Sequence, residues 1–566
     1  MNSLKILAFV AILLSVVLVS CRVHKNKPTA AVSIPAASSK TDSIKAERKE
    51  EAEYPIGPEY TTSTGIDSIL KSVRDFVPYA TKVQEFYAQR NFKLAWSDNG
   101  VFLPQAAMFM NILRNTDKEG LNMAKYHPES LNALYKFASE KEHKNREKLI
   151  LVRKQLDVFF TAAFFDYAQD EWQGRVDPKI EGWNADTKKI KYSSALQAIL
   201  DKRNSKDPFT ELEPEHPEYH ALKVALSKYR AIEDAGGWPT IPSTSKLGDT
   251  SEAVFLTKKL LYLTGDLLNF TPDSIYTPQL KIAVQKFQQR HGITPDGIID
   301  KNTLQELNVT ISDRITQLLV NMERWRWVPD KLQDDYIMIN IPEFTLHVIE
   351  KNKEIWNMKV IVGQQIKQTP IFNSKVELVV VNPNWTVPHS IAIAEMLPSL
   401  QQNPGYLSKH DMELLNGSGK DTIDPRTIDW NTVTPENFSY TIRQKPGGEN
   451  ALGTLKFLFP NDYSVYMHDT PAHYLFAQQK REFSHGCIRL EQPLRLAQYL
   501  LKRDSTTRSI DIDILLIEQD EKYIKLKRTE PVYILYFTAW VDSKGQLNYR
   551  PDYYGHDADL KKALFN

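Results

Sequence analysis

The chain has 566 residues, a length that allows about three or four domains at roughly 150 residues each. It carries 71 Lys and Arg residues against 70 Asp and Glu residues, so its net charge of +1 gives no reason to expect nucleic acid as a partner. With 42% hydrophobic and 10% aromatic residues, the composition excludes a disordered or membrane-embedded chain and indicates ordinary globular domains.

Cys21, one of only two cysteines, ends a segment with the pattern of an export signal. The apolar stretch from Ile6 to Val19 is too short to cross about 30 Å of hydrocarbon as a helix, but it has the length of a signal-peptide core. It ends in Leu18-Val19-Ser20-Cys21, which resembles the bacterial lipobox, where the cysteine is acylated and becomes the mature N-terminus. We therefore expect a lipoprotein signal peptide at residues 1–21 with Cys21 as the lipidation site. The alternative is a short uncleaved anchor.

Residues 22–58 consist mainly of Lys, Ala, Ser, Pro and Glu and contain almost no large apolar residues. Such a segment cannot bury enough apolar surface to fold, so we expect a disordered tether. As a flexible chain of roughly 36 residues, it would have an end-to-end distance of about 30 to 36 Å.

Residues 59–240 are expected to form a helical scaffold domain. Apolar residues recur there at spacings of three and four, which is typical of a buried helix face, at Leu149, Val152, Leu156, Phe159, Phe160, Ala163 and Tyr167. We assign no chemistry to this domain. A segment rich in Gly, Pro and Ser at residues 236–243 then separates it from the next unit.

Residues 247–310 are expected to form a compact unit of short helices. A helical pattern follows Tyr276-Thr277-Pro278-Gln279-Leu280, with Val284 and Phe287 on its apolar face and with Gly292 and Gly297 placed to close turns. This stretch resembles the small three-helix peptidoglycan-binding domain that is appended to many wall hydrolases. The alternative is a helical spacer, because the fold can persist without its binding function.

After another helical segment, residues 311–327, the hydrophobic period changes from that of a helix to that of a strand. Ile337, Ile339 and Ile341 alternate with other residues, and further strand-like runs continue to Val381 and resume at Leu455. We expect a mostly-β domain at residues 333–517. The stretch at about 390–440 resembles an insertion with a helix of its own near 393–401, and an insertion beside a site is often a lid.

Residues 518–566 are expected to form a C-terminal β extension. The run from Pro531 to Val541 is rich in β-branched and aromatic residues, so we expect it to complete or flank the sheet of the preceding domain. We assign it no chemistry.

The second cysteine, Cys487, lies in a segment that combines a thiol with imidazoles. A strand-like segment at 464–467 leads to His468, and Cys487 follows nineteen residues later within Ser484-His485-Gly486-Cys487-Ile488-Arg489-Leu490. A thiol attacks carbonyl groups as thiolate, and at its ordinary pKa near 8.5 only about 3% is ionised at neutral pH, so a neighbouring imidazole that takes the proton removes this limit. His468 and His485 are both candidates. Gly486 lacks a Cβ, so amide N–H groups near Cys487 could approach a substrate and stabilise an oxyanion.

His468-Asp469-Thr470-Pro471, followed at this spacing by the segment around Cys487, resembles the signature of L,D-transpeptidases with a YkuD-type catalytic domain, in particular their large multidomain class of Gram-negative bacteria. Similar segments occur at residues 323–327, 382–388, 403–407, 442–447, 450–453 and 456–457. The resemblance covers nearly all of the chain from about residue 60. It implies a multidomain α+β protein with a helical scaffold domain, a three-helix peptidoglycan-binding domain and a mostly-β catalytic domain with an inserted helical lid.

The resemblance implies that Cys487 attacks the carbonyl joining the third residue of a donor stem peptide, a diamino acid, to the terminal D-alanine. D-Alanine would leave and a thioester would remain. The side-chain amine of a second stem peptide would then resolve the thioester and form a 3-3 cross-link in peptidoglycan, without ATP, a cofactor or a metal. The expected partners are stem peptides and, through the lipid on Cys21, a membrane. The protein would be a periplasmic monomer anchored to the cell membrane or the outer membrane.

By the same resemblance, His468 would be the general base and proton donor, oriented by the backbone carbonyl of Asp469 in place of a triad carboxylate. Some family members have a different residue where this chain has His485, which places His468 ahead of it as the base. His485 would instead help to shape the pocket.

Other residues of the segment would surround the thiol. Ser484 would also shape the pocket, while Gly486 and Cys487 would supply oxyanion donors. Tyr466 and Arg489 would contact the substrate, although Arg489 could instead form a structural salt bridge.

Several other functions fit parts of the pattern. A metal site at His468, Asp469, His473 and His485 is disfavoured because a proline interrupts any helix that could pair the histidines. A papain-like peptidase would place its cysteine before its histidine. The same fold could hydrolyse the thioester, either as a carboxypeptidase or as an amidase that releases wall-linked proteins, and the sequence leaves this open. A lipoprotein that only grips peptidoglycan would not need the pair of thiol and imidazole.

Overall fold

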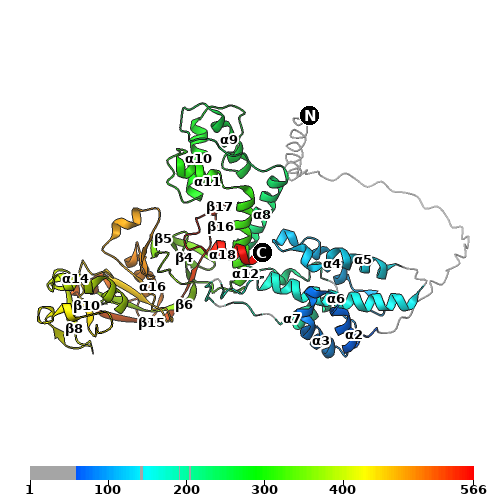
Figure 1. The fold of residues 1–566 in the computed structure, drawn as a ribbon, viewed down its shortest axis with the longest axis horizontal. Helices are drawn as coiled ribbons and strands as arrows, with labels where there is room; N and C mark the ends of the chain where they lie inside the picture. The colour runs from blue at the N-terminus through cyan, green and yellow to red at the C-terminus, as the bar shows by residue number, and fades with distance from the viewer. Residues whose placement is uncertain are drawn as a thin grey trace, which may run out of the picture. The chain divides into compact units, whose positions relative to one another are not determined.

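The computed structural model of the protein describes residues 59–140, 145–180, 182–185, 187–189, 191–202, 205–417 and 419–565 (Figure 1). The predicted signal peptide, the lipidation site Cys21 and the tether lie outside the described residues. Within these ranges, no helix is both long and apolar enough to cross a membrane.

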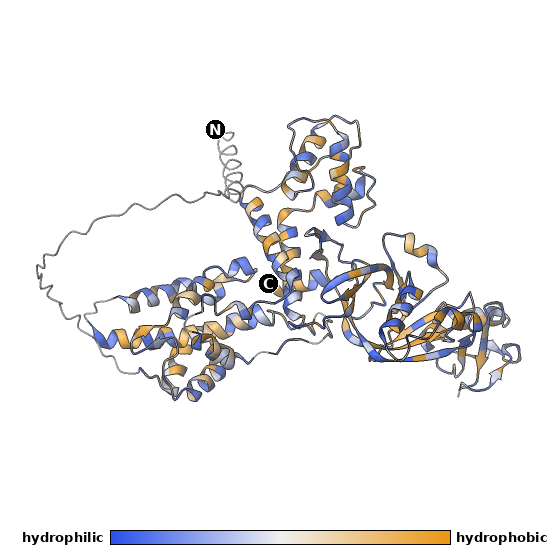
Figure 2. Cartoon of the chain, turned by 180° about the vertical axis from the view of Figure 1, so that it is seen from behind, coloured by the Kyte–Doolittle hydropathy of each residue, from blue (hydrophilic) through white to orange (hydrophobic). Residues whose placement is uncertain are grey.

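The N-terminal part is helical, as predicted. Its elements are α2 Ser63–Leu70, η1 Arg74–Tyr79, α3 Ala80–Gln89, β1 Ser97–Asp98, β2 Val101–Phe102, α4 Pro104–Leu113, η2 Thr116–Glu119, η3 Met123–Tyr126, α5 Pro128–Ser139, α6 Arg146–Trp172, α7 Tyr192–Asp201, η4 Thr210–Leu212 and α8 Pro217–Asp234. The long helix α6 contacts α2, α3, α5 and α7, and every residue of its predicted apolar stripe is buried. Figure 2 shows apolar residues along these helices. Helix α6 begins at Asn145, whose side chain accepts a hydrogen bond from the Lys148 N–H and so satisfies a free donor of the first turn.

The next unit consists of three helices around a core of its own. They are α9 Glu252–Thr264, α10 Pro278–Arg290 and α11 Lys301–Leu307, and each begins at a residue whose side chain caps the first turn: Ser251, Thr277 and Asp300. Val284 and Phe287 are buried, as the apolar pattern predicts. Helix α12, Ile311–Trp327, has the bounds expected from the sequence and leads to the β-rich part.

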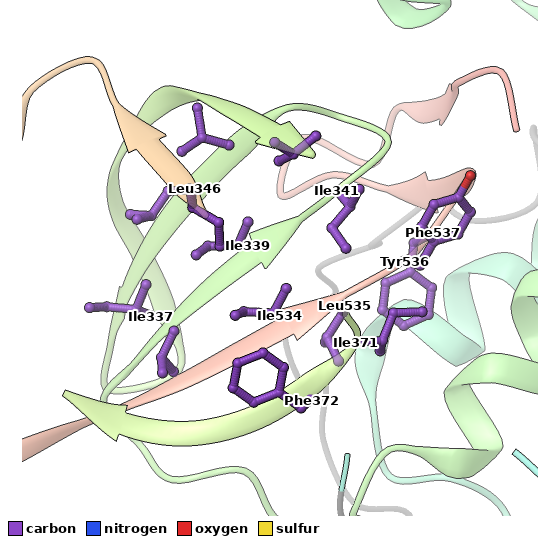
Figure 3. Packing of buried hydrophobic residues seen from close by; sticks show 14 of the residues in the cluster. Ile337, Ile339, Ile341, Leu346, Ile371, Phe372, Ile534, Leu535, Tyr536 and Phe537 are labelled. Carbon is purple, nitrogen blue, oxygen red and sulfur yellow. The ribbon is translucent and has the colours of Figure 1, made fainter. Parts of the chain in front are cut away.

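The β-rich part contains a nine-stranded sheet that closes on itself. Its strand order is β13-β5-β14-β12-β11-β6-β15-β3-β4, and β4 also pairs with β5, so β13 is the one strand outside the ring. The strands are β3 Tyr336–Asn340, β4 Thr345–Glu350, β5 Lys353–Gly363, β6 Phe372–Val381, β11 Leu455–Leu458, β12 Met467–His468, β13 Glu482–Ser484, β14 Ile488–Leu490 and β15 Lys522–Leu535. Ile337, Ile339 and Ile341 are buried, which confirms the predicted alternation, and they pack against residues of β4, β6 and β15 (Figure 3). Helices α16 Pro493–Arg503 and α17 Ile512–Glu518 connect β14 to β15.

The boundary drawn at residue 517 cuts through this sheet and needs correction. Strand β15 lies inside the sheet, antiparallel to β6 and parallel to β3, which confirms that this run completes the sheet; the boundary at residue 517 was placed too early. The chain then forms a hairpin of β16 Ala539–Val541 and β17 Leu547–Tyr549, and ends in helix α18 His556–Phe565.

The inserted segment at residues 385–444, called the insertion below, is not only helical. Its helical turns are α13 His389–Ile391, the π-helical turn η5 Ala392–Met396, α14 Leu397–Gln402, α15 Tyr406–Lys409, η6 Pro425–Thr427 and η7 Trp430–Thr432. They pack on a separate four-stranded sheet in the order β7-β10-β8-β9, whose strands are β7 Trp385–Thr386, β8 Met412–Leu415, β9 Thr422–Ile423 and β10 Thr441–Gln444. Leu400, Leu414 and Ile442 are fully buried in this small core, so the insertion is a mixed α/β subdomain.

Candidate active site

Three neighbouring strands of the nine-stranded sheet place the predicted site residues on one face. In the strand register, Lys456 on β11 pairs with His468 on β12, which pairs with Arg489 on β14. Side chains alternate along strands, so Tyr466 and Cys487, each two residues earlier, belong to the same face. The opposite face is apolar and fully buried, with Phe457, Met467, Ile488 and Leu490. The sheet therefore separates a polar face from the hydrophobic core.

The contacts on this face agree with the register. The Lys456 Nζ lies 4.1 Å from the centroid of the Tyr466 ring, and the rings of Tyr466 and His468 are 5.6 Å apart. Burial is the main cause that raises the pKa of Tyr466, and the nearby thiol of Cys487 raises it further. The hydroxyl therefore stays protonated and can donate a hydrogen bond. Strand β12 is shorter than the predicted segment 464–467, because Ser464 adopts a φ of +56°, which a β-strand does not accommodate.

The Cys487 thiol is partly exposed and donates to the Ser464 carbonyl at 3.8 Å. Burial raises its pKa, while hydrogen bonding to Tyr466 and the positive charges of Lys456 and Arg489 act in the opposite direction without cancelling the effect of burial. The thiol is therefore protonated at neutral pH, and a base must remove its proton before it can react as a thiolate.

His468 is held in one tautomer. Its Nδ1 lies 2.5 Å from the backbone carbonyl oxygen of Asp469, and since a carbonyl oxygen only accepts, Nδ1 carries the hydrogen and Nε2 keeps its lone pair. Burial, together with the charges of Arg489 and Lys456, lowers the pKa of His468 to about 3, although the bond to Asp469 opposes this. The imidazole is therefore neutral at physiological pH and can accept a proton at Nε2.

The carboxylate of Asp469 stabilises the turn after β12. It accepts hydrogen bonds from the Thr454 N–H at 2.9 Å, the Thr454 hydroxyl at 3.0 Å and the Thr470 N–H at 2.8 Å. Gly453 has a φ of +60°, and a Cβ at that position would collide with the carboxylate. The side chain of Asp469 thus fixes the turn after β12, and its backbone carbonyl is the group that contacts His468.

The turn before Cys487 changes one expectation. Gly486 has a φ of +115°, a backbone conformation that favours glycine, and its N–H donates to the Ser484 hydroxyl at 3.1 Å. The same hydroxyl donates to the Cys487 carbonyl at 2.5 Å, and Thr369 donates to the Gly486 carbonyl at 2.8 Å. The Gly486 amide is therefore occupied and not available as an oxyanion donor in this geometry. No hydrogen bond in the described part of the chain engages the Cys487 N–H, which leaves it as the candidate donor.

Arg489 has no carboxylate within ion-pair distance among the described residues, so the alternative of a structural salt bridge is not realised. Its Nε is buried without a hydrogen-bond partner in this part of the chain, and burial lowers the pKa of the guanidinium while the thiol of Cys487 and the hydroxyl of Tyr474 oppose the shift. A partly buried guanidinium with an unpaired Nε is suited to bind a carboxylate of a ligand.

The insertion reaches the motif through His485. The His485 Nε2 lies 2.9 Å from the Glu395 carboxylate oxygen, in a pair whose side chains are 33% and 49% exposed. Glu395 belongs to the π-helical turn η5, a kind of turn that is frequent at functional sites.

Sequence reasoning did not single out Lys456 or Glu395. Lys456 had a usable signal, since one polar residue alternates with the buried Leu455 and Phe457 on an internal strand. Glu395 had none, because its position depends on how the insertion folds.

Comparison with known proteins defines the class of this domain. Residues 334–534 match the family model described as "L,D-transpeptidase catalytic domain" (YkuD), so the chain contains a catalytic domain of this kind. Residues 250–307 match "Putative peptidoglycan binding domain", and residues 81–226 match "Scaffold domain". The protein therefore combines a scaffold domain, a peptidoglycan-binding domain and a YkuD-type L,D-transpeptidase catalytic domain.

A curated protein of Haemophilus influenzae, named "Putative L,D-transpeptidase", is 34% identical over 271 residues, which are 47% of this chain and 54% of that protein. The chain thus spans about half the length of this relative. Among solved structures, an L,D-transpeptidase from Xylanimonas cellulosilytica matches at 13% identity over 52% of this chain and 100% of that chain, with a TM-score of 0.17. One from Stackebrandtia nassauensis matches at 16% identity over 52% and 96%, with a TM-score of 0.21. TM-scores this low carry no weight for the fold.

Proposed function

We propose that this protein is an L,D-transpeptidase that forms 3-3 cross-links between peptidoglycan stem peptides through a thioester on Cys487. The observation that carries the proposal is that Cys487, immediately before β14, and His468 on the adjoining strand β12 lie on one polar sheet face, beside the cations Lys456 and Arg489. The matched catalytic and peptidoglycan-binding domains support the substrate class.

In the first half-reaction, the Cys487 Sγ attacks the carbonyl that precedes the terminal D-alanine of a donor stem. The neutral Nε2 of His468 takes the thiol proton as the C–S bond forms, and then delivers it to the nitrogen of the departing D-alanine as the C–N bond breaks. The Cys487 N–H stabilises the oxyanion, and Arg489 binds the terminal carboxylate of the donor.

In the second half-reaction, the side-chain amine of an acceptor stem attacks the thioester and the thiol is restored. One amide bond replaces another, so the reaction needs no ATP. Water can resolve the same thioester, and the product would then be a shortened monomer. That hydrolytic outcome is the second candidate function, because the neutral Nε2 of His468 can assist water as well as an amine.

The test uses the protein from residue 22 onward, in which Cys487 is the only thiol. Tetrapeptide-bearing muropeptides are added and the products are analysed by mass spectrometry, with Cys487→Ala as the matched control. We expect cross-linked dimers and free D-alanine from the wild type and neither from the control. Monomeric tripeptides alone would instead identify a hydrolase. No change with either protein would overturn an enzymatic role.

We also propose that the chain is exported to the periplasm and held at a membrane by lipid on Cys21, where it acts as a monomer. This rests on the sequence pattern of residues 1–21. Incorporation of labelled palmitate in the producing cells should disappear in Cys21→Ser and persist in Cys487→Ala. Equal labelling of Cys21→Ser and the wild type would contradict it.

A further inference from the structure

The insertion brings one carboxylate to the catalytic motif. Glu395 projects from the π-helical turn η5 and contacts the Nε2 of His485, two residues before Cys487. A carboxylate can accept about four hydrogen bonds, and with half of its side-chain surface exposed, Glu395 can accept further donors besides His485. It can therefore bind a cationic group that approaches between the insertion and the motif.

The charges around Cys487 are arranged unevenly. The sheet face carries the cations Lys456 and Arg489, which act on the thiol and suit the carboxylate end of a donor peptide. The side of the insertion carries the anion Glu395, which suits an ammonium group. The two substrates proposed above differ in this respect, because the donor presents a terminal carboxylate and the acceptor presents a side-chain ammonium.

We propose that Glu395, together with His485, forms the binding site for the side-chain ammonium of the acceptor stem and receives its proton. This inference rests on the proposed function. It assigns the insertion a part in the choice of an amine over water.

The proton balance of the second half-reaction fits this assignment. The ammonium passes one proton to the pair of Glu395 and His485, which releases it to solvent, and becomes a nucleophilic amine. Its nitrogen attacks the thioester carbonyl, the C–N bond forms, and the C–S bond breaks with the electron pair going to sulfur. The second nitrogen proton passes through the Nε2 of His468 to the Cys487 sulfur. The products are a neutral amide, the free thiol and one released proton.

A purely structural contact would act differently. If Glu395 only held the insertion closed, its loss would affect every nucleophile that resolves the thioester. If Glu395 recognises the positive charge, its loss would affect the ammonium acceptor and spare a neutral nucleophile. Hydroxylamine is such a probe, because it is uncharged at mildly alkaline pH and converts a thioester into a hydroxamate.

The experiment uses the protein from residue 22 onward and compares the wild type, Glu395→Gln and Glu436→Gln with tetrapeptide muropeptides. Glu436 is an exposed carboxylate elsewhere on the insertion and serves as the matched control. The ratio of cross-linked dimer to hydrolysed monomer is measured without hydroxylamine. The ratio of hydroxamate to hydrolysed monomer is measured with hydroxylamine added.

We expect the first ratio to fall about two- to fivefold in Glu395→Gln, as for loss of a partly exposed ion pair, with the second ratio unchanged. Both ratios should stay at the wild-type value in Glu436→Gln, and Glu395→Asp should restore part of the first ratio. Equal falls in both ratios, or no change in either, would overturn the inference. A wild type that makes neither dimers nor free D-alanine would instead refute the proposed function, so the two failures are distinguishable.

Discussion

At the scale of single residues, the two central groups of the site are both neutral before substrate binds. Burial raises the pKa of the Cys487 thiol and lowers the pKa of the His468 imidazole to about 3. Both shifts oppose the thiolate–imidazolium pair that makes some cysteines reactive in the free enzyme. In the mechanism proposed above, His468 would therefore act as a general base only while the C–S bond forms, and the resting thiol would be protected from oxidation and alkylation between turnovers.

This electrostatic picture predicts how Cys487 reacts with iodoacetamide in the protein from residue 22 onward. The alkylation rate should rise with pH along one curve whose apparent pKa lies above the ordinary value of about 8.5, with no reactive plateau at lower pH. Because the positive charge of Lys456 favours the thiolate, Lys456→Met should raise this apparent pKa by roughly half to one pH unit.

Intact mass spectrometry at a series of pH values measures the rates. Lys353→Met removes an exposed charge at the start of β5 and should leave the curve in place. A fast-reacting thiolate well below the ordinary cysteine pKa would show that the resting site is an ion pair.

The sequence contained enough to single out Cys487 and His468, which the structure places on one sheet face, but not enough to predict all of their surroundings. His468 and Cys487 follow from a local motif with a fixed spacing. The occupied amide of Gly486 could not be foreseen, because it depends on the rotamer of the Ser484 hydroxyl. Glu395 reaches His485 only through the tertiary fold of the insertion, and no local pattern encodes that contact.

At the scale of elements, the nine-stranded sheet depends on a strand that the sequence places after the catalytic motif. Strand β15 pairs with β6 on one side and β3 on the other, so it joins the two halves of the ring. Long apolar patterns such as α12 and the alternating isoleucines of β3 were predicted correctly. The two-residue strands β7 and β9 of the insertion were missed, since two residues cannot show a period.

Two positions on β15 test this role of the strand. Ile534 is fully buried in the core, whereas Tyr523 is 62% exposed on the same strand. Ile534→Ala should lower the free energy of unfolding by about 2 to 5 kcal/mol, through lost burial and the cavity left behind. Tyr523→Ala should change it by less than about 0.5 kcal/mol.

Urea unfolding followed by tryptophan fluorescence measures both variants against the wild type. If β15 were an appended extension, both substitutions would have similar small effects on the unfolding transition of the domain that carries Cys487. A small effect of Ile534→Ala would therefore contradict the integral position of the strand.

At the scale of the whole described chain, helix α12 is joined to the N-terminal helices through buried charges. Arg326 on α12 donates to the carboxylate of Glu171 on α6 at 3.1 Å, to Glu323 at 3.2 Å and to the hydroxyl of Tyr219 on α8 at 2.9 Å. These side chains are almost fully buried. In this buried cluster, one cation faces the two carboxylates of Glu171 and Glu323. Ionising both carboxylates would leave one buried negative charge uncompensated, which is costly.

The pKa values of Glu171 and Arg326 reflect this excess of carboxyl groups over cations. Burial raises the pKa of Glu171 from its ordinary 4.5 to about 8, against the lowering effect of Arg326, while the neighbouring Glu119 raises it further. The pKa of Arg326 is also raised, because Tyr219 and the surrounding carboxyl groups together outweigh the effect of burial, so the guanidinium keeps its charge. With a pKa of about 8, Glu171 holds a proton at neutral pH. A carboxyl group with a raised pKa in the folded state stabilises the fold below its unfolded pKa and loses this contribution as pH rises through the folded pKa.

From this buried cluster we predict that the free energy of unfolding depends on pH through the titration of Glu171. In the wild type, the contribution should be complete below about pH 4.5 and should decline up to about pH 8, by at most about 5 kcal/mol, since one pKa unit corresponds to about 1.4 kcal/mol. Glu171→Gln keeps the shape and the neutral state of the side chain, so its unfolding free energy should decline less over the same range and should exceed that of the wild type at the alkaline end. Glu233→Gln, an exposed substitution on α8, should follow the wild type. Urea unfolding at a series of pH values measures all three proteins, and a Glu171→Gln curve parallel to that of the wild type would show that Glu171 is ionised in this buried cluster.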